Sequence, residues 1–338
     1  MKSNDEYWMR RAIGLARKGH GHVSPNPAVG CVIVGSNGTV VGEGWHRRYG
    51  EGHAEVNAVA SVRDPKLLRG ATVYVTLEPC SHYGKTPPCA KLLAEMPIAR
   101  VVAGSVDPNP KVSGRGLEML RRAGKEVEAG VLEDECRAVN PAFLCAQELG
   151  RPFITLKWAR TADGFMGATD RRLLISGPQG QVWCHRERAM HDAILVGRHT
   201  VEADDPHLDT RRWPGGNPLP VVVGGDGSPL AGSFLSSAPD TLWLPYASDL
   251  PALVESLWRE HHLSSVLVEG GSRLLQAFID AGLYDRIRVE TSPEAVGPSA
   301  AISAPDVPVD VILSETMRLG SNRLEIFARG RNLTLKKI

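Results

Sequence analysis

The chain is organised around His53-Ala54-Glu55, which is followed along the sequence by Pro79-Cys80 and by Cys89. Zinc binds imidazole nitrogen and thiolate sulfur, and a catalytic zinc keeps one coordination position open for water. The pattern therefore predicts a metal site with His53, Cys80 and Cys89 as its ligands. Glu55 lies two residues from the ligand histidine and would not contact the metal. We expect it to be the catalytic residue, which takes a proton from the attacking water and passes it to a leaving nitrogen.

This order of residues is the one with which zinc-dependent nucleobase deaminases assemble their site. The alternative is a structural zinc site, which would need four protein ligands, with His82 or His46 as the fourth. The ordered pattern favours the catalytic site, because scattered histidines and cysteines rarely reproduce it. One departure from the shortest form of the pattern is visible: residues 81–88 separate the two cysteines.

Length and composition bound the class of protein. A chain of 338 residues is long enough for about two domains. The net charge is +1, with 19 basic and 16 acidic residues in 1–150 and 20 basic and 22 acidic residues in 151–338. Neither half has the basic excess of a nucleic-acid-binding protein. Six cysteines, two of them in the metal pattern, indicate a reducing compartment rather than a disulfide framework. Residues 1–17 lack the apolar core of a signal peptide and no transmembrane run is visible, so we expect a cytoplasmic protein with no membrane partner.

The first half of the sequence alternates between predicted strands and helices. Strands are expected at residues 29–34, 40–45, 71–77 and 100–105, with a hairpin turn at 35–38. Helices are expected from residue 53, from residue 89 and at 117–123, and a first helix would be capped by residues 4–6. This alternation predicts a layered α/β domain.

A second domain is predicted beyond a bridge at residues 137–143 and 150–152. Strands are expected at 153–159, 193–197, 221–223, 241–244 and 265–269, and helices at 178–189, 250–260 and 273–281. The strand ending at Glu269 runs directly into Gly270-Gly271-Ser272, where the N–H groups of a helix start would suit a phosphate group. Residues 324–327 fit a last strand, either internal to the sheet or paired with a second subunit.

Longer motifs surround these features. Those of the first domain are Pro25-Asn26-Pro27-x-Val29-Gly30, Gly52-His53-Ala54-Glu55, Glu78-Pro79-Cys80-Ser81-His82-x-Gly84-x-Thr86-Pro87-Pro88-Cys89 and Asp107-Pro108-Asn109-Pro110-x-Val112-x-Gly114-x-Gly116. Those of the second domain are Ala162-Asp163-Gly164, Asp192-Ala193-Ile194-Leu195-Val196-Gly197, Thr200-x5-Pro206 and Val268-Glu269-Gly270-Gly271. Over nearly its whole length, the chain resembles the bifunctional deaminase and reductase family of riboflavin biosynthesis. The first set of motifs is specific, since tRNA and cytidine deaminases keep only the zinc core.

The resemblance implies the fold and two consecutive reactions. A cytidine-deaminase-like three-layer domain would occupy residues 1–146, and a dihydrofolate-reductase-like α/β domain residues 147–338. The first would use Zn²⁺ to remove the 2-amino group of 2,5-diamino-6-(ribosylamino)-4(3H)-pyrimidinone 5′-phosphate as ammonia. The second would use NADPH to reduce the opened ribosyl group to ribityl. The implied partners are this small phosphorylated pyrimidine and further copies of the chain, in a dimer or tetramer.

The resemblance also assigns contacts by position in the motifs. Substrate contacts in the deaminase domain would be Asn26, His82, Lys85, Asp107 and Asn109, although all five also fit turns or solvated loops. Cofactor contacts would be Ala159, Thr200, Asp204 and the run 271–277, which begins Gly271-Ser272-Arg273. Substrate contacts in the reductase domain would be Arg188, Leu208, Arg211 and Glu269. The two arginines suit a bidentate grip on phosphate, or else ordinary ion pairs. Asp204 and Glu269 are the candidates for the acid of the reduction.

One segment departs from the family pattern. The family usually shows Ser-x-Trp-Ile followed by Ser or Thr, whereas this chain has Arg172-Leu173-Leu174-Ile175-Ser176. A substrate-contacting serine would become Arg172, and a cofactor-packing tryptophan would become Leu174. Leucine keeps an apolar contact but loses the flat aromatic face. The departure concerns the pose of the substrate and the choice of cofactor.

Three rival functions stay open at this point. The first is a deaminase that acts on a base in nucleic acid, which the charge counts disfavour. The second is a non-catalytic protein with a structural zinc and a nucleotide-sensing second half. The third is a deaminase whose reductase domain is inactive or altered.

Overall fold

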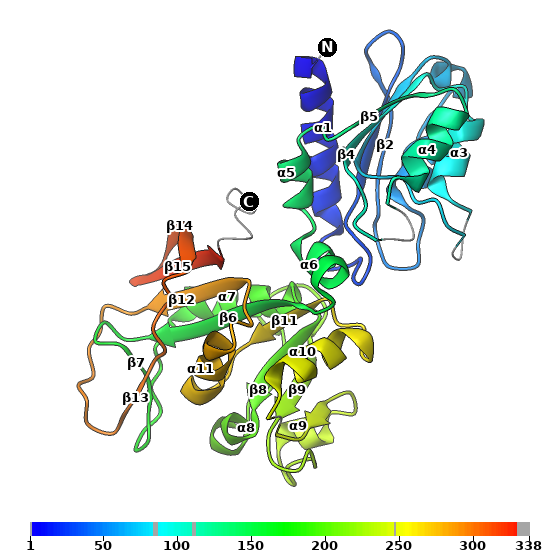
Figure 1. Cartoon of the computed structure of the whole chain (residues 1–338). Helices are drawn as coiled ribbons and strands as arrows, with labels where there is room; N and C mark the ends of the chain where they lie inside the picture. Colours follow the sequence, from blue (N-terminus) through cyan, green and yellow to red (C-terminus); the bar gives the residue numbers. More distant parts are fainter. Residues whose placement is uncertain (1, 84–86, 110–112, 247, 330–338) are drawn as a thin grey trace. The chain divides into compact units, whose positions relative to one another are not determined.

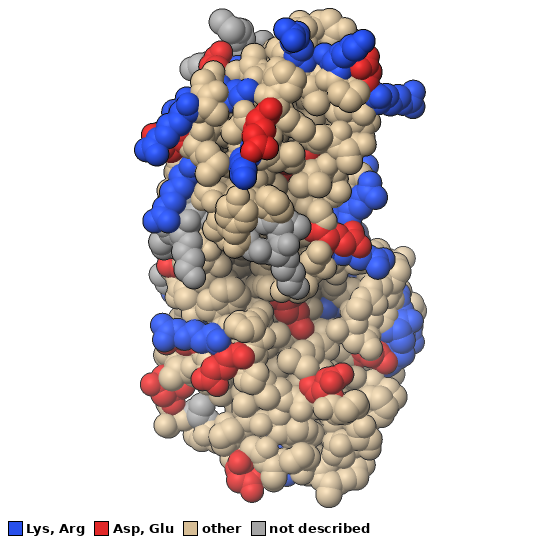
Figure 2. All heavy atoms as spheres, turned by 90° about the vertical axis from the view of Figure 1, so that its right-hand side faces the viewer, with Lys and Arg blue, Asp and Glu red and all other residues tan. Residues whose placement is uncertain are grey.

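The protein is described here by a computed structural model that covers residues 2–83, 87–109, 113–246 and 248–329. The chain forms two compact units that divide between Leu149 and Gly150 (Figure 1). Lys85, one of the expected substrate contacts, lies outside the described residues. Over the described ranges, no helix is both long enough and apolar enough to cross a membrane. On the face that Figure 2 shows, acidic side chains lie among the basic ones on each unit, in line with the balanced charge counts.

The first unit is built on a five-stranded sheet in the order β2-β1-β3-β4-β5. β1 pairs antiparallel with β2 and β3, whereas β3, β4 and β5 are parallel. The strands are β1 (Gly30–Val34), β2 (Val40–Trp45), β3 (Thr72–Leu77), β4 (Arg100–Ser105) and β5 (Glu126–Ala129). The helices are α1 (Lys2–Ala16), α2 (Ala54–Ala60), α3 (Cys89–Glu95), α4 (Arg115–Arg122), α5 (Glu133–Arg137) and α6 (Pro141–Leu149).

Helices cover both faces of this sheet because its central strands are apolar on both faces. Cys31 and Ile33 of β1 pack in one buried cluster with α2, α3 and α4. Val32 and Val34, which alternate with them, pack in another with α1 and α5. A strand that is covered on both sides is expected to be apolar throughout. The arrangement confirms the predicted three-layer α/β domain.

The first helix begins earlier than predicted. α1 starts at Lys2, so residues 4–6 lie inside the helix rather than at its cap. Asp5 is buried and accepts hydrogen bonds from the Tyr74 hydroxyl and the Arg100 guanidinium, both at 2.8 Å. A carboxylate that looked like a local capping signal is therefore held by partners that are distant in the sequence.

The predicted bridge between the domains is mostly helical. α5 and α6 occupy residues 133–137 and 141–149, and α6 ends at Leu149, where the first unit ends. Asn140, between the two helices, accepts a hydrogen bond from Ala28 N (2.7 Å) and donates one to Ala28 O (2.8 Å). This pair of bonds fastens the segment to the residues before β1.

The second unit is built on an eight-stranded sheet in the order β10-β9-β8-β11-β6-β12-β15-β14. The strands from β10 to β12 are parallel, and β15 and β14 are antiparallel to their neighbours. The strands are β6 (Phe153–Arg160), β8 (Ala193–Gly197), β9 (Leu219–Val223), β10 (Leu242–Leu244), β11 (Ser265–Val268), β12 (Arg286–Thr291), β14 (Val311–Leu319) and β15 (Asn322–Arg329), with β7 (Phe165–Ala168) and β13 (Ala301–Ser303) in a separate pair. The helices are α7 (Pro178–Ala189), α8 (Arg198–Asp204), α9 (Phe234–Ser237), α10 (Leu250–Arg259) and α11 (Ser272–Asp280). This architecture confirms the predicted α/β class of the second domain.

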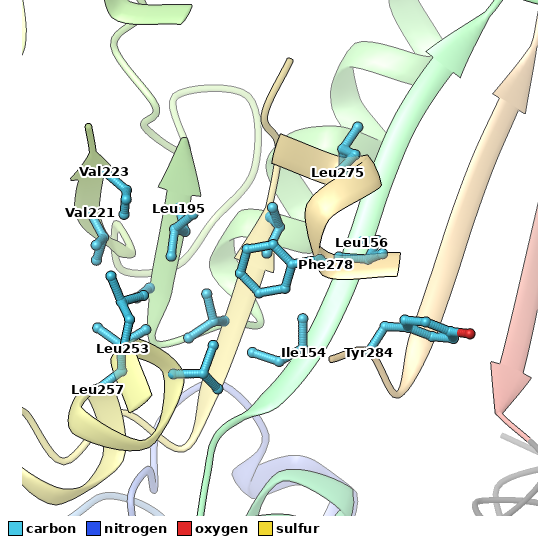
Figure 3. Close-up of a cluster of buried hydrophobic side chains, with 14 of the residues drawn as sticks. Ile154, Leu156, Leu195, Val221, Val223, Leu253, Leu257, Leu275, Phe278 and Tyr284 are labelled. Carbon is cyan, nitrogen blue, oxygen red and sulfur yellow. The ribbon is translucent and has the colours of Figure 1, made fainter. Parts of the chain in front are cut away.

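The largest core of the second unit lies between α10, α11 and one face of the sheet. Leu257 of α10 and Phe278 of α11 pack there against the strands, among them Ile154 and Leu156 of β6 (Figure 3). Side chains alternate between the two faces of a strand. Lys157 of β6 therefore points to the opposite face, the one on which α7 contributes charged side chains.

The last strand is internal to its own sheet. β15 lies between β12 and β14, so both of its edges carry ladder hydrogen bonds within the chain. The alternative of residues 324–327 pairing with a second subunit is therefore wrong. β14 ends the sheet on this side.

Candidate active site

Three side chains from three different elements converge in the first unit. His53 immediately precedes α2, Cys80 follows β3, and Cys89 opens α3. His53 Nδ1 lies 3.5 Å from Cys80 Sγ and 3.4 Å from Cys89 Sγ. A tetrahedral zinc with bonds of ~2.0–2.3 Å holds nitrogen and sulfur ligands ~3.5 Å apart. All three ligand atoms lie within 4.8 Å of one another, so the residues fit a zinc ion.

The packing of α2 on β2 fixes two of the site residues. Gly44 of β2 is needed there, because a Cβ at this position would lie 2.3 Å from Ala58 N and 2.6 Å from Ala54 O. The close approach sets the first turn of α2, and with it His53 and Glu55. On the other side of the site, Cys89 N donates a hydrogen bond of 3.3 Å to Cys80 Sγ.

Neither histidine considered as a fourth ligand joins this group within the described ranges. The His46 ring centroid lies 5.5 Å from that of His53, and His46 Nδ1 lies 3.4 Å from Pro27 O. His82 is exposed and interacts electrostatically with Asp107. Three protein ligands leave a coordination position for water, which favours a catalytic over a structural zinc.

Glu55 is buried in the first turn of α2, with 3% of its surface exposed. Burial, and then the negative charge of Cys80, raise the pKa of Glu55 to about 7. The hydrogen bond from the Cys89 thiol, more than any other contact, lowers the pKa of Cys80, so this sulfur rather than that of Cys89 carries the negative charge of the pair. A carboxyl group that titrates near neutral pH can both accept and donate a proton, as a general acid–base catalyst must.

The remaining deaminase residues lie around the two loops that follow β3 and β4. Asp107 is buried, and burial, more than any other cause, raises its pKa to about 6. The charges of Glu78 and Cys80 act in the same direction, whereas the hydrogen bond from Asn109 N and the charge of His82 lower this pKa. Asp107 Oδ1 accepts that hydrogen bond of 2.8 Å from Asn109 N. Asn26 is half-buried in a turn that its own N–H closes on Val23 O (2.9 Å). The structure therefore brings together three of the expected contacts near the metal ligands: His82, Asp107 and Asn109. Asn26 lies in a turn, which was the other interpretation of its sequence.

In the second unit, β8 and β11 are neighbouring parallel strands, and α8 and α11 begin just after them, at the carboxyl-terminal edge of the sheet. A Cβ added to Gly271, before α11, would lie 3.7 Å from Thr200 Oγ1 in α8. No side chain caps the start of α11 among the described residues, so its N–H groups are available to an anion. This edge fits a phosphate-bearing cofactor. Asp204 and Arg273 are exposed on the two helices, and Ala159 lies at the end of β6.

A buried charged cluster lies on the α7 face of the same sheet. Arg188 of α7 donates to both carboxylate oxygens of Glu269, at 3.2 Å and 2.9 Å, and both side chains are nearly buried. The Cys184 thiol lies 3.3 Å from Glu269 Oε1. Burial raises the pKa of Glu269, but the charges of Arg188 and Lys157 outweigh it and lower that pKa to about 2. Glu269 is therefore a carboxylate at neutral pH.

The second predicted arginine reaches this cluster through Asp209. Arg211 pairs with Asp209 Oδ1 at 2.6 Å, and Arg188 NH1 donates to Asp209 O at 3.2 Å. Leu208, expected to contact substrate, is buried in an apolar cluster with β8 and β9. Arg172 and Leu174 are both exposed, Leu174 by 76% of its surface. The structure thus brings Arg188, Arg211 and Glu269 together, whereas Arg172 and Leu174 lie on the surface.

Sequence reasoning missed two members of this cluster. Lys157 interacts electrostatically with Glu269, and the charges around Lys157 raise its pKa despite burial. Cys184 is the other, and burial raises the pKa of its thiol. A lysine inside an otherwise apolar strand was a signal that could have identified Lys157; nothing in the sequence distinguished Cys184.

Two family models match the chain. The cytidine and deoxycytidylate deaminase zinc-binding region matches residues 2–105, and the RibD C-terminal domain matches residues 152–325. Among curated relatives, the riboflavin biosynthesis protein RibD of Actinobacillus pleuropneumoniae is 38% identical over 318 residues, which cover 86% of this chain and 84% of that protein. The protein of the same name from Escherichia coli (strain K12) is 37% identical over 332 residues, covering 88% and 89%.

Solved structures agree with these matches. Acinetobacter baumannii RibD has a TM-score of 0.86 and 32% identity, covering 97% of this chain and 99% of that one. A Thermotoga maritima diaminohydroxyphosphoribosylaminopyrimidine deaminase/5-amino-6-(5-phosphoribosylamino)uracil reductase has a TM-score of 0.84 and 34% identity over the same shares. With both domains matched, the chain belongs to the RibD family of bifunctional, zinc- and NADPH-dependent deaminases and reductases of riboflavin biosynthesis.

Proposed function

We propose that His53, Cys80 and Cys89 bind the zinc ion of the deaminase and that Glu55 is its catalytic residue. The observation that carries this proposal is the convergence of one imidazole and two sulfurs, 3.4–3.5 Å apart, beside a buried carboxyl group. Zinc, when bound, activates a water molecule for attack on the ring carbon that bears the 2-amino group.

Glu55 moves the protons of the hydrolysis. It accepts one proton from the attacking water and passes it to the ring nitrogen next to the carbon under attack. It then carries the second proton to the departing amine, so that the carbon–nitrogen bond breaks and ammonia leaves. Its raised pKa of about 7 suits both transfers, because neither protonation state is strongly disfavoured at neutral pH.

The loops after β3 and β4 orient the pyrimidine. We assign Asp107, Asn109 and His82 to this role because they lie close to the thiolate of Cys80. Asn26 completes the set from the turn before β1. Lys85 is assigned by its motif position alone.

The edge of the second sheet where α8 and α11 begin binds NADPH. Thr200, Gly271 and Ser272 supply donors for its phosphate groups, with Asp204 and Arg273 at the rim and Ala159 at the end of β6. Leu174 would replace an aromatic contact with an aliphatic one. The cofactor supplies a hydride to C1 of the opened ribosyl group.

The substrate side of the reductase consists of Arg188, Leu208, Arg211 and Glu269, with the exposed Arg172 at its border. Because its pKa lies at about 2, Glu269 is an acceptor rather than the acid that the reduction needs. Lys157 is an ammonium ion beside it, since the surrounding negative charge raises the lysine pKa. Of the two acids suggested by sequence, we therefore keep Asp204 as the donor of the proton that accompanies the hydride, and assign Lys157 to holding the charge of Glu269.

The sequence placed the boundary between the deaminase and reductase domains after residue 146; we propose that it lies three residues later, at the end of α6, where the two units divide. We further propose a cytoplasmic homo-oligomer, a dimer or tetramer, which light scattering of the purified chain would test. A monomer at micromolar concentration would contradict it.

Two assays test the proposed function. The first compares ammonia release from the phosphorylated diaminopyrimidinone with release from RNA; we expect activity on the small substrate, and activity on RNA alone would overturn the proposal. The second follows the absorbance of NADPH and of NADH with deaminated substrate. We expect oxidation of NADPH; oxidation of neither cofactor would overturn the reductase assignment and leave the second unit a binding domain.

A further inference from the structure

Glu78 is a buried carboxylate that the mechanism above does not use. It follows β3 and immediately precedes Pro79 and the metal ligand Cys80, and only 3% of its surface is exposed. Among the residues that the structure describes, its partners are four backbone N–H groups. Oε2 accepts from Asp107 N (3.2 Å) and Gly114 N (2.9 Å), and Oε1 accepts from Gly116 N (2.9 Å) and Leu117 N (3.4 Å).

These four donors belong to the two ends of one segment. Asp107 begins the loop after β4, and residues 114–117 form the start of α4. The Glu78 side chain thereby links Asp107, just after β4, to the start of α4. The positive end of the α4 dipole adds to the attraction for the carboxylate.

The same segment lies directly against the peptide that leads to Cys80. A Cβ on Gly116 would come within 2.0 Å of Pro79 O and 3.2 Å of Glu78 Oε1. Glycine is needed here because of this approach of two backbones. Asp107, at the other end, interacts electrostatically with both Glu78 and Cys80.

We propose that Glu78 is a positioning residue for deamination, which fixes the substrate-binding residues Asp107 and Asn109 at a set distance from Cys80. The inference rests on the proposed substrate contacts. If Glu78 were released, Asp107 N and the start of α4 would lose their common acceptor, and the pyrimidine would meet a displaced loop. The metal ligands would stay in place, because β3, α2 and α3 hold them independently.

The isosteric variant Glu78→Gln isolates this role. All four partners of Glu78 are donors, so the site needs an acceptor-only group. An amide keeps the shape of the side chain but turns one N–H₂ group toward backbone N–H groups. Loss of one hydrogen bond to a charged group changes an equilibrium about 10- to 100-fold. We expect the KM of deamination to rise by about this factor, with a smaller change in kcat.

The measurements separate positioning from folding. Zinc content of Glu78→Gln should equal that of the wild type, and NADPH oxidation with deaminated substrate should be unchanged. Hydrogen exchange at residues 113–117 should accelerate without a matching change in β3. The control is Glu118→Gln, which removes an exposed carboxylate from the same helix α4 and should alter none of these values.

Two outcomes would overturn the inference: wild-type KM and exchange rates in Glu78→Gln, or loss of zinc together with loss of the fold of the first unit. Should the glutamine variant prove insoluble, Glu78→Asp keeps the charge but is one methylene too short for all four donors, and the same criteria apply to it. Asn109→Ala tests the proposed contact separately. A wild-type KM for Asn109→Ala would remove that residue from the substrate site and leave the exchange result for Glu78 standing.

Discussion

Replacing Arg188 with methionine should destabilise the second unit by about 3 kcal/mol. The change removes both hydrogen bonds to Glu269, at 3.2 Å and 2.9 Å, from a pair whose side chains are only 13% and 11% exposed. Removing one partner of a buried ion pair costs about 3–5 kcal/mol, because the other charge is left unpaired. We expect the lower end of that range, since Lys157 and Cys184 still face the carboxylate.

The assay is scanning calorimetry of the full chain, with residual deaminase activity after heating to identify the transition of the first unit. For a unit of this size, 3 kcal/mol corresponds to a decrease in Tm of about 6–12 °C. The matched control is Arg259→Met on α10, which breaks an exposed pair with Glu255 and should cost less than about 0.5 kcal/mol.

A double-mutant cycle with Glu269→Gln completes the experiment. The double variant has neither charge, so its loss of stability should be smaller than the sum of the two single losses by about 1 kcal/mol or more. Equal Tm values for Arg188→Met and Arg259→Met, or strict additivity in the cycle, would refute the claim that this ion pair is buried and coupled.

Three further results are expected. The folded-state pKa of Glu269 is lowered from 4.5 to about 2, so its ionised form stabilises the second unit by about 3 kcal/mol above about pH 4.5. This stabilisation should be lost as the pH falls from 4.5 toward 2. Denaturant titrations that show the same acid sensitivity in wild type and Glu269→Gln would contradict it. Cys184→Ala should raise the KM of the reduction ~2–5-fold, because it removes a weak donor to Glu269 Oε1, whereas Cys184→Ser keeps a donor and should not. Deamination should be unaffected in both variants. Identical reduction kinetics for Cys184→Ala and wild type would show that the thiol does not help to hold Glu269. Removal of zinc with a chelator should abolish deamination and spare NADPH oxidation, because His53, Cys80 and Cys89 all belong to the first unit; parallel loss of both activities, or failure of added zinc to restore deamination, would argue against separate sites.

The sequence predicted well those elements that carry strong local signals. β4 (Arg100–Ser105), α7 (Pro178–Ala189) and β8 (Ala193–Gly197) have the predicted bounds. Proline at the first turn of α7 and continuous apolar runs in the two strands account for this success. The predicted bridge at residues 137–143 instead spans the end of α5 and the start of α6, and the Asn140 side chain between these helices holds Ala28.

The three metal ligands and Glu55 were also predictable, since these four residues lie in short motifs whose order is typical of zinc-dependent deamination. The reductase cluster was predictable only in part. Arg188 and Glu269 are 81 residues apart in the sequence, and their pairing depends on the register of α7 over β11. Lys157 joins them only because β6 lies beside β11, an order that no local pattern encodes. Similarly, Glu78 was visible as part of a motif, but its four backbone partners follow from the path of the chain after β4.

The most direct test of the account is Glu55→Gln, measured for bound zinc and for ammonia release on the same preparation. The amide fills the same buried space but cannot carry a proton, and general acid–base catalysis contributes about 10²–10⁴-fold to such rates. The account predicts wild-type zinc content, unchanged NADPH oxidation and a loss of deamination in that range. Deamination at the wild-type rate with zinc retained would contradict it.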